Sequence, residues 1–278
     1  MPTLDTSRIS PTAHYTAYVW HRHGMSTPAL ATAKGRALFY TLQGPNRALA
    51  VAGQADLESL LLARHRVIDH ILKEAIDAGR VGQIVEIAAG LSPRGLRMRR
   101  RHPQVTYVEG DLPDMIANKE ALIGGQLSEG HRLVNINALA DDGPESLEAL
   151  AESLDKSKGV AVITEGLMPY FDGPTGAEIW QRISKFMRRF SEGLYLSDYY
   201  LGRDTNRILG AGVMSQLVGW FVSGSVHMPL KDDSELYEAL GEAGLSDVAV
   251  HMAGDFAHEL QIESPKRTGY VRVIEART

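Results

Sequence analysis

The stretch Val81-Gly-Gln-Ile-Val-Glu-Ile-Ala-Ala-Gly-Leu91 decides the fold. Its apolar run predicts a β-strand that enters a turn of small residues. A second apolar run, Tyr107-Val-Glu-Gly-Asp111, follows after one helix-length segment and ends on an acid about twenty residues after the turn. A strand, a small-residue turn, a helix and a second strand with a terminal acid are typical of a Rossmann-type sheet that binds an adenosine.

The turn differs from the G-x-G-x-x-G pattern that binds a dinucleotide pyrophosphate. Ala88, Ala89 and Gly90 allow a ligand to lie against the backbone, but the next helix opens with Ser92-Pro93-Arg94 rather than with a glycine-rich phosphate cradle. This favours a nucleoside cofactor without phosphates, and S-adenosylmethionine is the common one.

The composition sets the class of protein. With 278 residues, of which 44% are hydrophobic and 23% charged, we expect one large α/β domain with an added cap. No cysteine is present, which excludes disulfides, thiolate chemistry and cysteine-based metal sites. We predict no metal site, because only His21 and His23 stand at a ligand-like spacing and no partners for them can be named.

The charge and the hydropathy pattern bear on partners and location. The net charge of −5 and the pI near 6.1 give no general electrostatic reason to bind nucleic acid. The basic run formed by Arg97 and residues 99–101 is interpreted as the last turn of a helix, where cations complement the macrodipole. No apolar stretch of membrane-spanning length occurs, so we expect a soluble cytoplasmic protein without a membrane partner.

Strand and helix patterns alternate along the chain. Apolar positions at helical spacing predict a helix from Leu57 to Ala78 that stops at Gly79, and a second helix from Ser234 to Ala243. Segments between the earlier strands are long enough for crossover helices, so the sheet should be mostly parallel and covered on both faces. The seven predicted strands are Gln83 to Ala88, Val105 to Glu109, Leu133 to Asn137, Val160 to Thr164, Leu194 to Ser197, Val248 to Met252 and Tyr270 to Ile274.

These elements divide the chain into four segments. Residues 1–56 form an N-terminal helical cap, and residues 57–200 form the cofactor-binding core. Residues 201–245, which mix glycines with large apolar residues, are predicted to be a helical lid over the carboxyl edge of the sheet. Residues 246–278 supply the last two strands.

Five motifs are distributed over most of the chain. They are Glu86-Ile-Ala-Ala-Gly-Leu-Ser-Pro-Arg-Gly95, Tyr107-Val-Glu-Gly-Asp-Leu-Pro113, Ile163-Thr-Glu-Gly-Leu-Met-Pro-Tyr170, Ile9-Ser-Pro-Thr-Ala-His-Tyr-Thr-Ala-Tyr-Val-Trp20 and Ala140-Asp-Asp-Gly-Pro144. Together they resemble the leucine carboxyl methyltransferase family, within it the bacterial branch of polyketide O-methyltransferases. The resemblance implies the class I, Rossmann-like methyltransferase fold with S-adenosylmethionine as cofactor.

Two acids near the end of the second strand compete for the ribose. Asp111 at the strand end can accept hydrogen bonds from both ribose hydroxyls, and Glu109, two residues earlier, points to the same face and is the alternative. Asp111 could instead serve as a helix N-cap. Ala88 and Gly90 allow close approach of the methionine part, although the family usually has glycine at the position of Ala88.

The other predicted cofactor residues lie on the same edge of the sheet. The resemblance implies that Arg64 meets the methionine carboxylate, a pairing that suits a planar guanidinium. The alternative is a solvated helix face, on which Arg66 and its i,i+3 partner Asp69 form a surface ion pair. Asn137 occupies a position where relatives more often carry aspartate; its amide can bond the adenine amino group, or Asp141 can replace it. The resemblance also assigns Glu86, Ala138 and Glu165 to the cofactor, the last near its amino group or ribose.

Methyl transfer from a sulfonium requires mainly an in-line acceptor in a site closed to water. A carboxylate acceptor needs no general base, whereas a phenol with a pKa near 10 would gain from one. The base candidates, if one is needed, are His14, His227 and Asp198. The candidates for substrate contact are Tyr15, Tyr18, Tyr170, Tyr199 and Tyr200.

These inferences predict an S-adenosylmethionine-dependent O-methyltransferase. The resemblance implies as acceptor a carboxylate of a small aromatic or polyketide-like molecule of secondary metabolism. Three alternatives remain open: a phenolic O-methyltransferase with a histidine or aspartate base, a protein C-terminal carboxyl methyltransferase with an open groove, and a non-catalytic nucleoside-binding protein.

Overall fold

The computed structural model describes residues 10–51, 56–201, 227, 229–262, 268–269 and 271–278. Most of the predicted lid, residues 201–245, therefore lies outside the described residues, and so does Tyr270, the predicted first residue of the last strand. Among the described residues, no helix is both long enough and apolar enough to cross a membrane.

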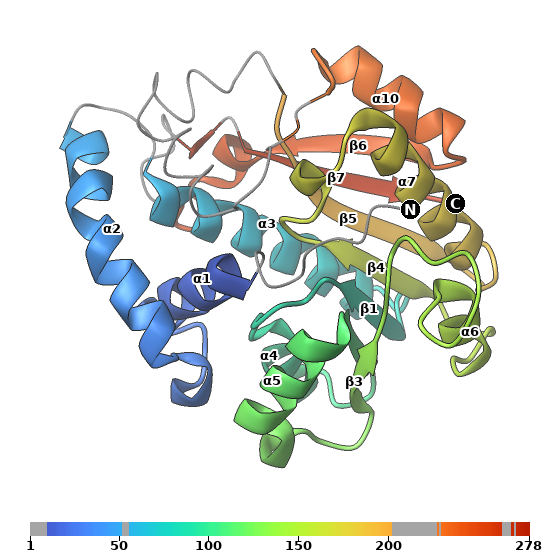
Figure 1. The fold of residues 1–278 in the computed structure, drawn as a ribbon. Helices are drawn as coiled ribbons and strands as arrows, with labels where there is room; N and C mark the ends of the chain where they lie inside the picture. Colours follow the sequence, from blue (N-terminus) through green and yellow to red (C-terminus); the bar gives the residue numbers. More distant parts are fainter. Residues whose placement is uncertain (1–9, 52–55, 202–226, 228, 263–267, 270) are drawn as a thin grey trace.

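One sheet of seven strands runs through the centre of the molecule (Figure 1). The strands are β1 (Gln83–Ile87), β2 (Thr106–Asp111), β3 (His131–Asn135), β4 (Val160–Thr164), β5 (Gly193–Tyr199), β6 (Ser246–Met252) and β7 (Arg272–Arg277). Their order across the sheet is β3-β2-β1-β4-β5-β7-β6. Strands β1 to β5 pair with one another in parallel, and β7 lies antiparallel between β5 and β6. The predicted mostly parallel seven-stranded sheet is confirmed.

The third strand is shifted from its predicted position. The sequence predicts Leu133 to Asn137, but the ladder of β3 ends at Asn135, which pairs with Asp111. The backbone amide of Asn137 donates to the carbonyl oxygen of Glu145 at 2.9 Å, so the chain has left the sheet at that point. Asn137 therefore follows the strand instead of ending it.

Helices connect the strands and cover both faces of the sheet. The described α-helices are α1 (Ser10–Arg22), α2 (Ala33–Val51), α3 (Leu57–Asp77), α4 (Arg94–Arg101), α5 (Pro113–Ile123), α6 (Leu147–Glu152), α7 (Gly173–Met187) and α10 (Asp233–Glu242). Short 3₁₀ helices are η2 (Pro28–Leu30), η3 (Gly124–Gln126), η4 (Met168–Tyr170) and η7 (Ala253–Phe256).

Two apolar clusters fill the space between these layers. On one face, α6, α7 and α10 pack against the sheet, where Trp180 of α7 and Leu236 of α10 belong to the same buried cluster as Val162. On the other face, α3 packs against the sheet and contributes more residues than any other element to the cluster that contains Ile84 and Ile163. Apolar burial of this kind stabilises by roughly 25 cal/mol per Å² and holds the strand ends in fixed positions.

Helix α3 has clear start and stop signals. The Asp56 side chain caps its first turn by accepting a hydrogen bond from the amide of Ser59 at 2.9 Å, and Gly79 follows the helix with a positive φ of 71°. The predicted span, Leu57 to Ala78, agrees with the observed helix to within one residue.

The two N-terminal helices form a layer of their own. Helices α1 and α2 pack against each other, and they share a third buried cluster with Leu61 and Leu62 of α3 (Figure 1). This arrangement places one side of α1 next to the carboxyl edge of the sheet.

Candidate functional site

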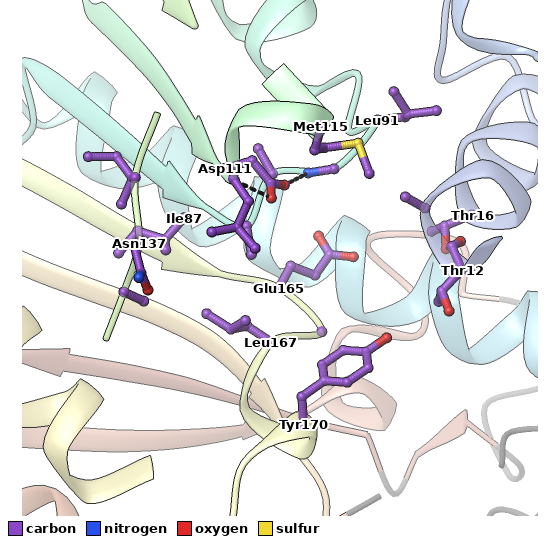
Figure 2. A pocket seen from close by; sticks show the side chains of 18 of the residues that line it. Thr12, Thr16, Ile87, Leu91, Asp111, Met115, Asn137, Glu165, Leu167 and Tyr170 are labelled. Atoms are coloured by element: carbon purple, nitrogen blue, oxygen red, sulfur yellow. Dashed lines mark hydrogen bonds between the residues drawn. The ribbon is translucent and has the colours of Figure 1, made fainter. Parts of the chain in front are cut away.

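A cavity of about 380 Å³ opens at the carboxyl ends of β1, β2 and β4 (Figure 2). Its size lies within the range of roughly 300 to 1,000 Å³ that is common for small-ligand sites, and its position is the usual one for ligands of open α/β sheets. The lining residues come from α1, α3, α5 and the loops that follow the strands. They are Thr12, Ala13, Thr16, Trp20, Arg64, Ile87, Ala88, Ala89, Gly90, Leu91, Asp111, Leu112, Asp114, Met115, Asn118, Ile136, Asn137, Ala138, Leu139, Glu165, Gly166, Leu167, Tyr170 and Phe171.

The turn after β1 forms a tight part of the cavity wall. Ala88 and Gly90 both have left-handed backbone conformations, with φ of 52° and 50°. A Cβ atom at Gly90 would lie 3.2 Å from the Cβ of Ala13, so α1 approaches this turn closely. Small residues are required here because the backbone conformation and the neighbouring helix leave little room.

Asp111 lies at the end of β2 and lines the cavity. Its Oδ2 accepts a hydrogen bond from the amide of Gly90 at 2.7 Å, and its Oδ1 accepts one from the amide of Leu112 at 2.8 Å. Burial raises the pKa of this carboxyl, while the two amide donors lower it. Each oxygen retains acceptor capacity for a second hydrogen bond, so the carboxylate can still receive two hydroxyl groups.

The loop after β3 contributes Asn137 and Ala138 to the lining. The Oδ1 of Asn137 accepts a hydrogen bond from the amide of Leu139 at 3.0 Å, which shapes the turn. Asp141, the alternative to Asn137, is instead largely exposed and forms an ion pair with Arg182 at 2.7 Å. It is not a lining residue.

Glu165, directly after β4, lines the cavity at the centre of a buried set of charges. Its Oε1 accepts a hydrogen bond from the Nε of Arg64 at 3.0 Å, and its Oε2 accepts one from Arg94 and lies 2.8 Å from the Nδ1 of His65. Burial alone would raise the pKa of Glu165, but its basic neighbours hold it well below its usual value. Glu165 is therefore ionised at neutral pH.

Arg64 lines the cavity and pairs with two acids. Its Nη1 donates to the Oδ2 of Asp198 at 2.8 Å, in addition to the contact with Glu165. A Cβ atom at Gly166 would lie only 2.9 Å from the Nη2 of Arg64, so the guanidinium is also confined by backbone. The alternative ion pair between Arg66 and Asp69 is not formed: Asp69 pairs with Arg94 and Arg97, and Arg66 donates to the carbonyl oxygen of Gln261 at 2.9 Å.

Glu86 departs from its predicted role. The side chain is buried and does not line the cavity; it accepts hydrogen bonds from Arg94 and from the hydroxyl of Tyr107, the latter at 2.7 Å. Arg94 thus links Glu86 to Glu165 behind the cavity wall. We refer to the linked residues Arg64, His65, Asp69, Glu86, Arg94, Glu165 and Asp198 as the cavity network.

Glu109, the alternative to Asp111, is also turned away from the cavity. Its carboxylate is fully buried in an ion pair with Lys119 and lies 2.7 Å from the Nε2 of His131. Two acids separated by one residue in β2 therefore have different surroundings, because Glu109 lies within the strand and Asp111 at its end.

None of the three base candidates lines the cavity. His14 is buried and its Nδ1 lies 2.9 Å from the hydroxyl of Thr32; burial and then Lys34 lower its pKa. Asp198 has no exposed side-chain surface, because Arg64 and the amide of Gly166, at 2.6 Å, occupy its two oxygens. The backbone amide of His227 donates to the carbonyl of Pro169 at 2.8 Å, outside the lining.

Only Tyr170 of the five predicted substrate tyrosines lines the cavity. Tyr15 accepts a hydrogen bond from Asn46 at 3.0 Å, and Tyr18 packs on Phe39, both within the N-terminal layer. The other two are core or network residues: Tyr199 lies in the core near Trp180, and Tyr200 hydrogen-bonds to Arg64.

Sequence reasoning missed the contribution of α1. Thr12, Thr16 and Trp20 line the cavity at intervals of four residues, the spacing of one helix face. Figure 2 shows the two threonines on α1 beside the cavity. Burial raises the pKa of Tyr170, and its hydroxyl bonds to Thr12, which ties α1 to the loop after β4. The spacing of four is present in the sequence, but the sequence alone favoured the aromatic face of the helix, with Tyr15 and Tyr18, as the face toward the substrate.

No group of three or more His, Cys, Asp or Glu side chains within the described part of the chain is arranged to hold a metal ion. In the described lining, the groups that can bind a ligand are the carboxylates, Arg64 and the turn of small residues after β1.

Comparisons with known proteins agree on the fold. A protein of Mycobacterium bovis named "Putative S-adenosyl-L-methionine-dependent methyltransferase" is 30% identical over 123 residues, which cover 44% of this chain and 38% of the relative. A protein of the same name from Mycobacteroides abscessus is 29% identical over 167 residues, covering 56% of this chain and 54% of the relative. The matched part of this chain thus spans about half or less of these relatives.

Solved structures give a similar result at lower identity. A DUF574 family protein from Streptomyces avermitilis has a TM-score of 0.67 at 12% identity, over 96% of this chain and 97% of the other. Human N-acetylserotonin methyltransferase in complex with S-adenosylmethionine has a TM-score of 0.50 at 13% identity, over 99% of this chain and 68% of the other. These likenesses concern the fold alone.

The family model described as leucine carboxyl methyltransferase matches residues 27–184. This range is more than half of the chain, and it contains the turn after β1, Asp111 and Glu165. The protein belongs to the leucine carboxyl methyltransferase family and has the Rossmann-like fold of S-adenosylmethionine-dependent methyltransferases.

Proposed function

We propose that this protein is an S-adenosylmethionine-dependent O-methyltransferase that methylates a carboxylate of a small aromatic or polyketide-like molecule. The observation that carries the proposal is that two carboxylates, Asp111 and Glu165, line one cavity at the carboxyl edge of the sheet (Figure 2). Family membership and the names of the relatives support the cofactor.

The cavity fits a nucleoside with a charged amino-acid chain. Asp111 has two acceptor positions left for ribose hydroxyls, and the turn from Ala88 to Gly90 lets a ligand lie against the backbone. Arg64 and Glu165 offer one cation and one anion to a zwitterionic group. Asn137 and Ala138 extend the lining beside Asp111.

S-adenosylmethionine supplies an electrophilic methyl group, so the protein has to position the acceptor and exclude water. Trp20, Leu167 and Phe171 contribute apolar wall to the cavity. Of the described residues that line it, none is a histidine. Glu165 is held by two arginines and its pKa lies well below its usual value, which makes it a poor proton acceptor, and both oxygens of Asp111 accept hydrogen bonds from backbone amides.

The absence of a histidine from the described lining supports a carboxylate as the acceptor. A carboxylate is already a nucleophile at neutral pH, whereas a phenol with a pKa near 10 would gain about 10²- to 10⁴-fold from a positioned base. The family description points in the same direction.

The cofactor is tested first, by thermal shift with S-adenosylmethionine, S-adenosylhomocysteine and NAD. A ligand at one hundred times its dissociation constant adds about 2.7 kcal/mol of apparent stability. We expect stabilisation by the first two compounds. Stabilisation by NAD alone would contradict the proposal.

The acceptor is then identified with matched pairs of aromatic acids and phenols and with a peptide that has a free C-terminal carboxylate. Mass spectrometry detects the methylated product, and mild alkali distinguishes a methyl ester, which releases methanol, from an aryl ether, which does not. We expect an alkali-labile ester of a small acid. An alkali-stable product would favour the phenolic alternative, and a peptide ester would favour a protein substrate.

A further inference from the structure

The side of Glu165 that faces away from the cavity is packed against two buried basic side chains that have no assigned role. Arg94 of α4 has no exposed surface. It donates from Nε to the Oδ1 of Asp69 at 2.6 Å, and from its two other nitrogens to Glu86 and Glu165. In a dinucleotide-binding protein, the start of the helix after the first strand binds phosphate. Here that position holds Arg94, and its side chain lies behind the cavity wall.

Both ring nitrogens of His65 lie close to an arginine, which can only donate. Nε2 lies 2.6 Å from the Nη2 of Arg97, and Nδ1 lies 2.8 Å from both the Nη2 of Arg94 and the Oε2 of Glu165. We infer that Nδ1 carries the proton and donates to Glu165, because the Nη2 of Arg94 has Glu165 as its acceptor, whereas a proton on Nε2 would point at Arg97. Burial, and after it the charge of Arg94, lower the pKa of His65, in agreement with a neutral ring.

Glu165 is consequently held on one side by fixed donors. Oε2 receives both Arg94 and His65, while Oε1 receives only Arg64 and keeps an acceptor position. The Trp20 ring, which lines the cavity, lies 4.6 Å from the His65 ring and covers this assembly. In Figure 2 the Glu165 carboxylate extends into the space between Asp111 and the threonines of α1.

We propose that Arg94 and His65 are positioning residues that fix the Glu165 carboxylate toward the cavity, where it binds the cationic amino group of the cofactor. The proposal rests on the proposed function and deepens it. A carboxylate that is already oriented loses less conformational freedom when the ligand binds. Removing a donor behind it should weaken cofactor binding without any contact to the cofactor being lost.

His65 offers a test in which the role of one nitrogen can be isolated. The side-chain amide nitrogen of asparagine can occupy the position of Nδ1 and donate to Glu165, whereas leucine cannot donate. His70 lies on the same helix with its ring against Phe256 and outside the cavity lining, so His70→Leu is the matched control.

Isothermal titration with S-adenosylmethionine measures the effect on the purified full chain. We expect His65→Leu to raise the dissociation constant about tenfold or more, and His65→Asn to return it to within about threefold of wild type. His70→Leu should leave it unchanged. If folded His65→Leu binds as tightly as wild type, or if the asparagine variant is as weak as the leucine variant, the positioning role is wrong.

Two further measurements separate this proposal from folding and from the proposed function. The ¹⁵N spectrum of histidine-labelled protein, assigned with His65→Asn, should show a neutral Nδ1-protonated ring for His65; the Nε2 tautomer would overturn the inference. If His65→Leu does not fold, the dissociation constant of His65→Asn and the ¹⁵N spectrum still test the positioning role of His65. Failure of wild type to bind S-adenosylmethionine would refute the proposed function as well, whereas tight binding by a folded leucine variant would refute only the positioning role.

Discussion

The molecule buries charge in two neighbouring regions, and only one of them reaches the cavity. The cavity network exposes parts of Arg64 and Glu165 to the site. A second group, here named the strand cluster, consists of Glu109 of β2, Lys119 of α5 and His131 of β3. All three side chains are buried, and none of them lines the cavity.

The comparison separates two uses of buried charge. Removing charges from water is costly, and ion pairing offsets this cost only when the partners are well placed. The strand cluster ties α5 to β2 and β3, so its contribution is structural. The cavity network holds a ligand-facing carboxylate in place, so part of its benefit appears only when the ligand binds. Mutations in the two regions should therefore change different measured quantities.

The largest effect is expected in the strand cluster. Lys119→Met leaves the buried carboxylate of Glu109 without its ammonium partner, which should lower the free energy of unfolding by about 3 to 5 kcal/mol. Urea denaturation measures this loss, and the dissociation constant for S-adenosylmethionine should not change at temperatures where the variant is folded. Lys73→Met, which removes an exposed ion pair with Asp77, is the control and should have no resolvable effect. Weaker cofactor binding with unchanged stability would reverse the assignment of the two regions.

On the cavity side, Asp111→Ala should weaken cofactor binding by about 1.5 to 3 kcal/mol, because charge-assisted hydrogen bonds to the ligand are lost. Calorimetry measures the change. Asp141→Ala serves as the control, since that acid is exposed and paired with Arg182 away from the cavity. Unchanged affinity in Asp111→Ala would remove this residue from the cofactor site.

Acid should destabilise the cavity network. Burial opposes ionisation of Asp69, but His65 when protonated, Arg97 and Arg94 hold its pKa at about 2, below the ordinary value of 3.8. A folded-state pKa below the unfolded value gives stability that is present above the unfolded pKa and lost as the pH falls through the folded pKa. We expect a loss of about 2 kcal/mol between about pH 5 and pH 2 from this group, with Glu165 adding in the same direction.

Urea denaturation across that pH range measures the loss, and Asp69→Asn should reduce the slope even though it lowers stability at pH 7. An unaltered slope in the variant would show that other acids dominate the acid sensitivity.

The smallest effect is expected at the histidines that seemed suitable as bases. His14→Gln and His227→Gln should each leave turnover within about twofold of wild type and its pH dependence flat above the pKa of the acceptor, because a carboxylate loses no proton. Loss of an ionisation from the pH profile in either variant would instead identify a base and favour a phenolic acceptor.

The sheet was predictable because its strands are short apolar runs between turn residues, as in Gln83–Ile87 and Val160–Thr164. Asp111 was identifiable because the end of a strand fixes where a side chain can point. Glu86 was misassigned because its orientation depends on Arg94, which is buried only when α4 packs on the sheet. A contact of this kind is tertiary and leaves no local pattern.

The N-terminal helix illustrates the same limit. His14, Tyr15 and Tyr18 form a conspicuous sequence cluster, but they face α2 and the apolar layer, because large rings gain most from burial there. The cavity receives Thr12 and Thr16 from the other side of the helix. Only the packing direction of α1 decides between the two faces.

The left-handed backbone at Ala88 restricts how this sequence can change over generations. That conformation costs a residue with a Cβ atom roughly 1 kcal/mol or more. The cost is higher for a β-branched residue and small for glycine. Relative to the alanine that is present, glycine should therefore relieve strain and β-branched residues should add to it. A survey of all substitutions scored only by cellular protein level should show glycine tolerated at residue 88 and valine, isoleucine and threonine depleted.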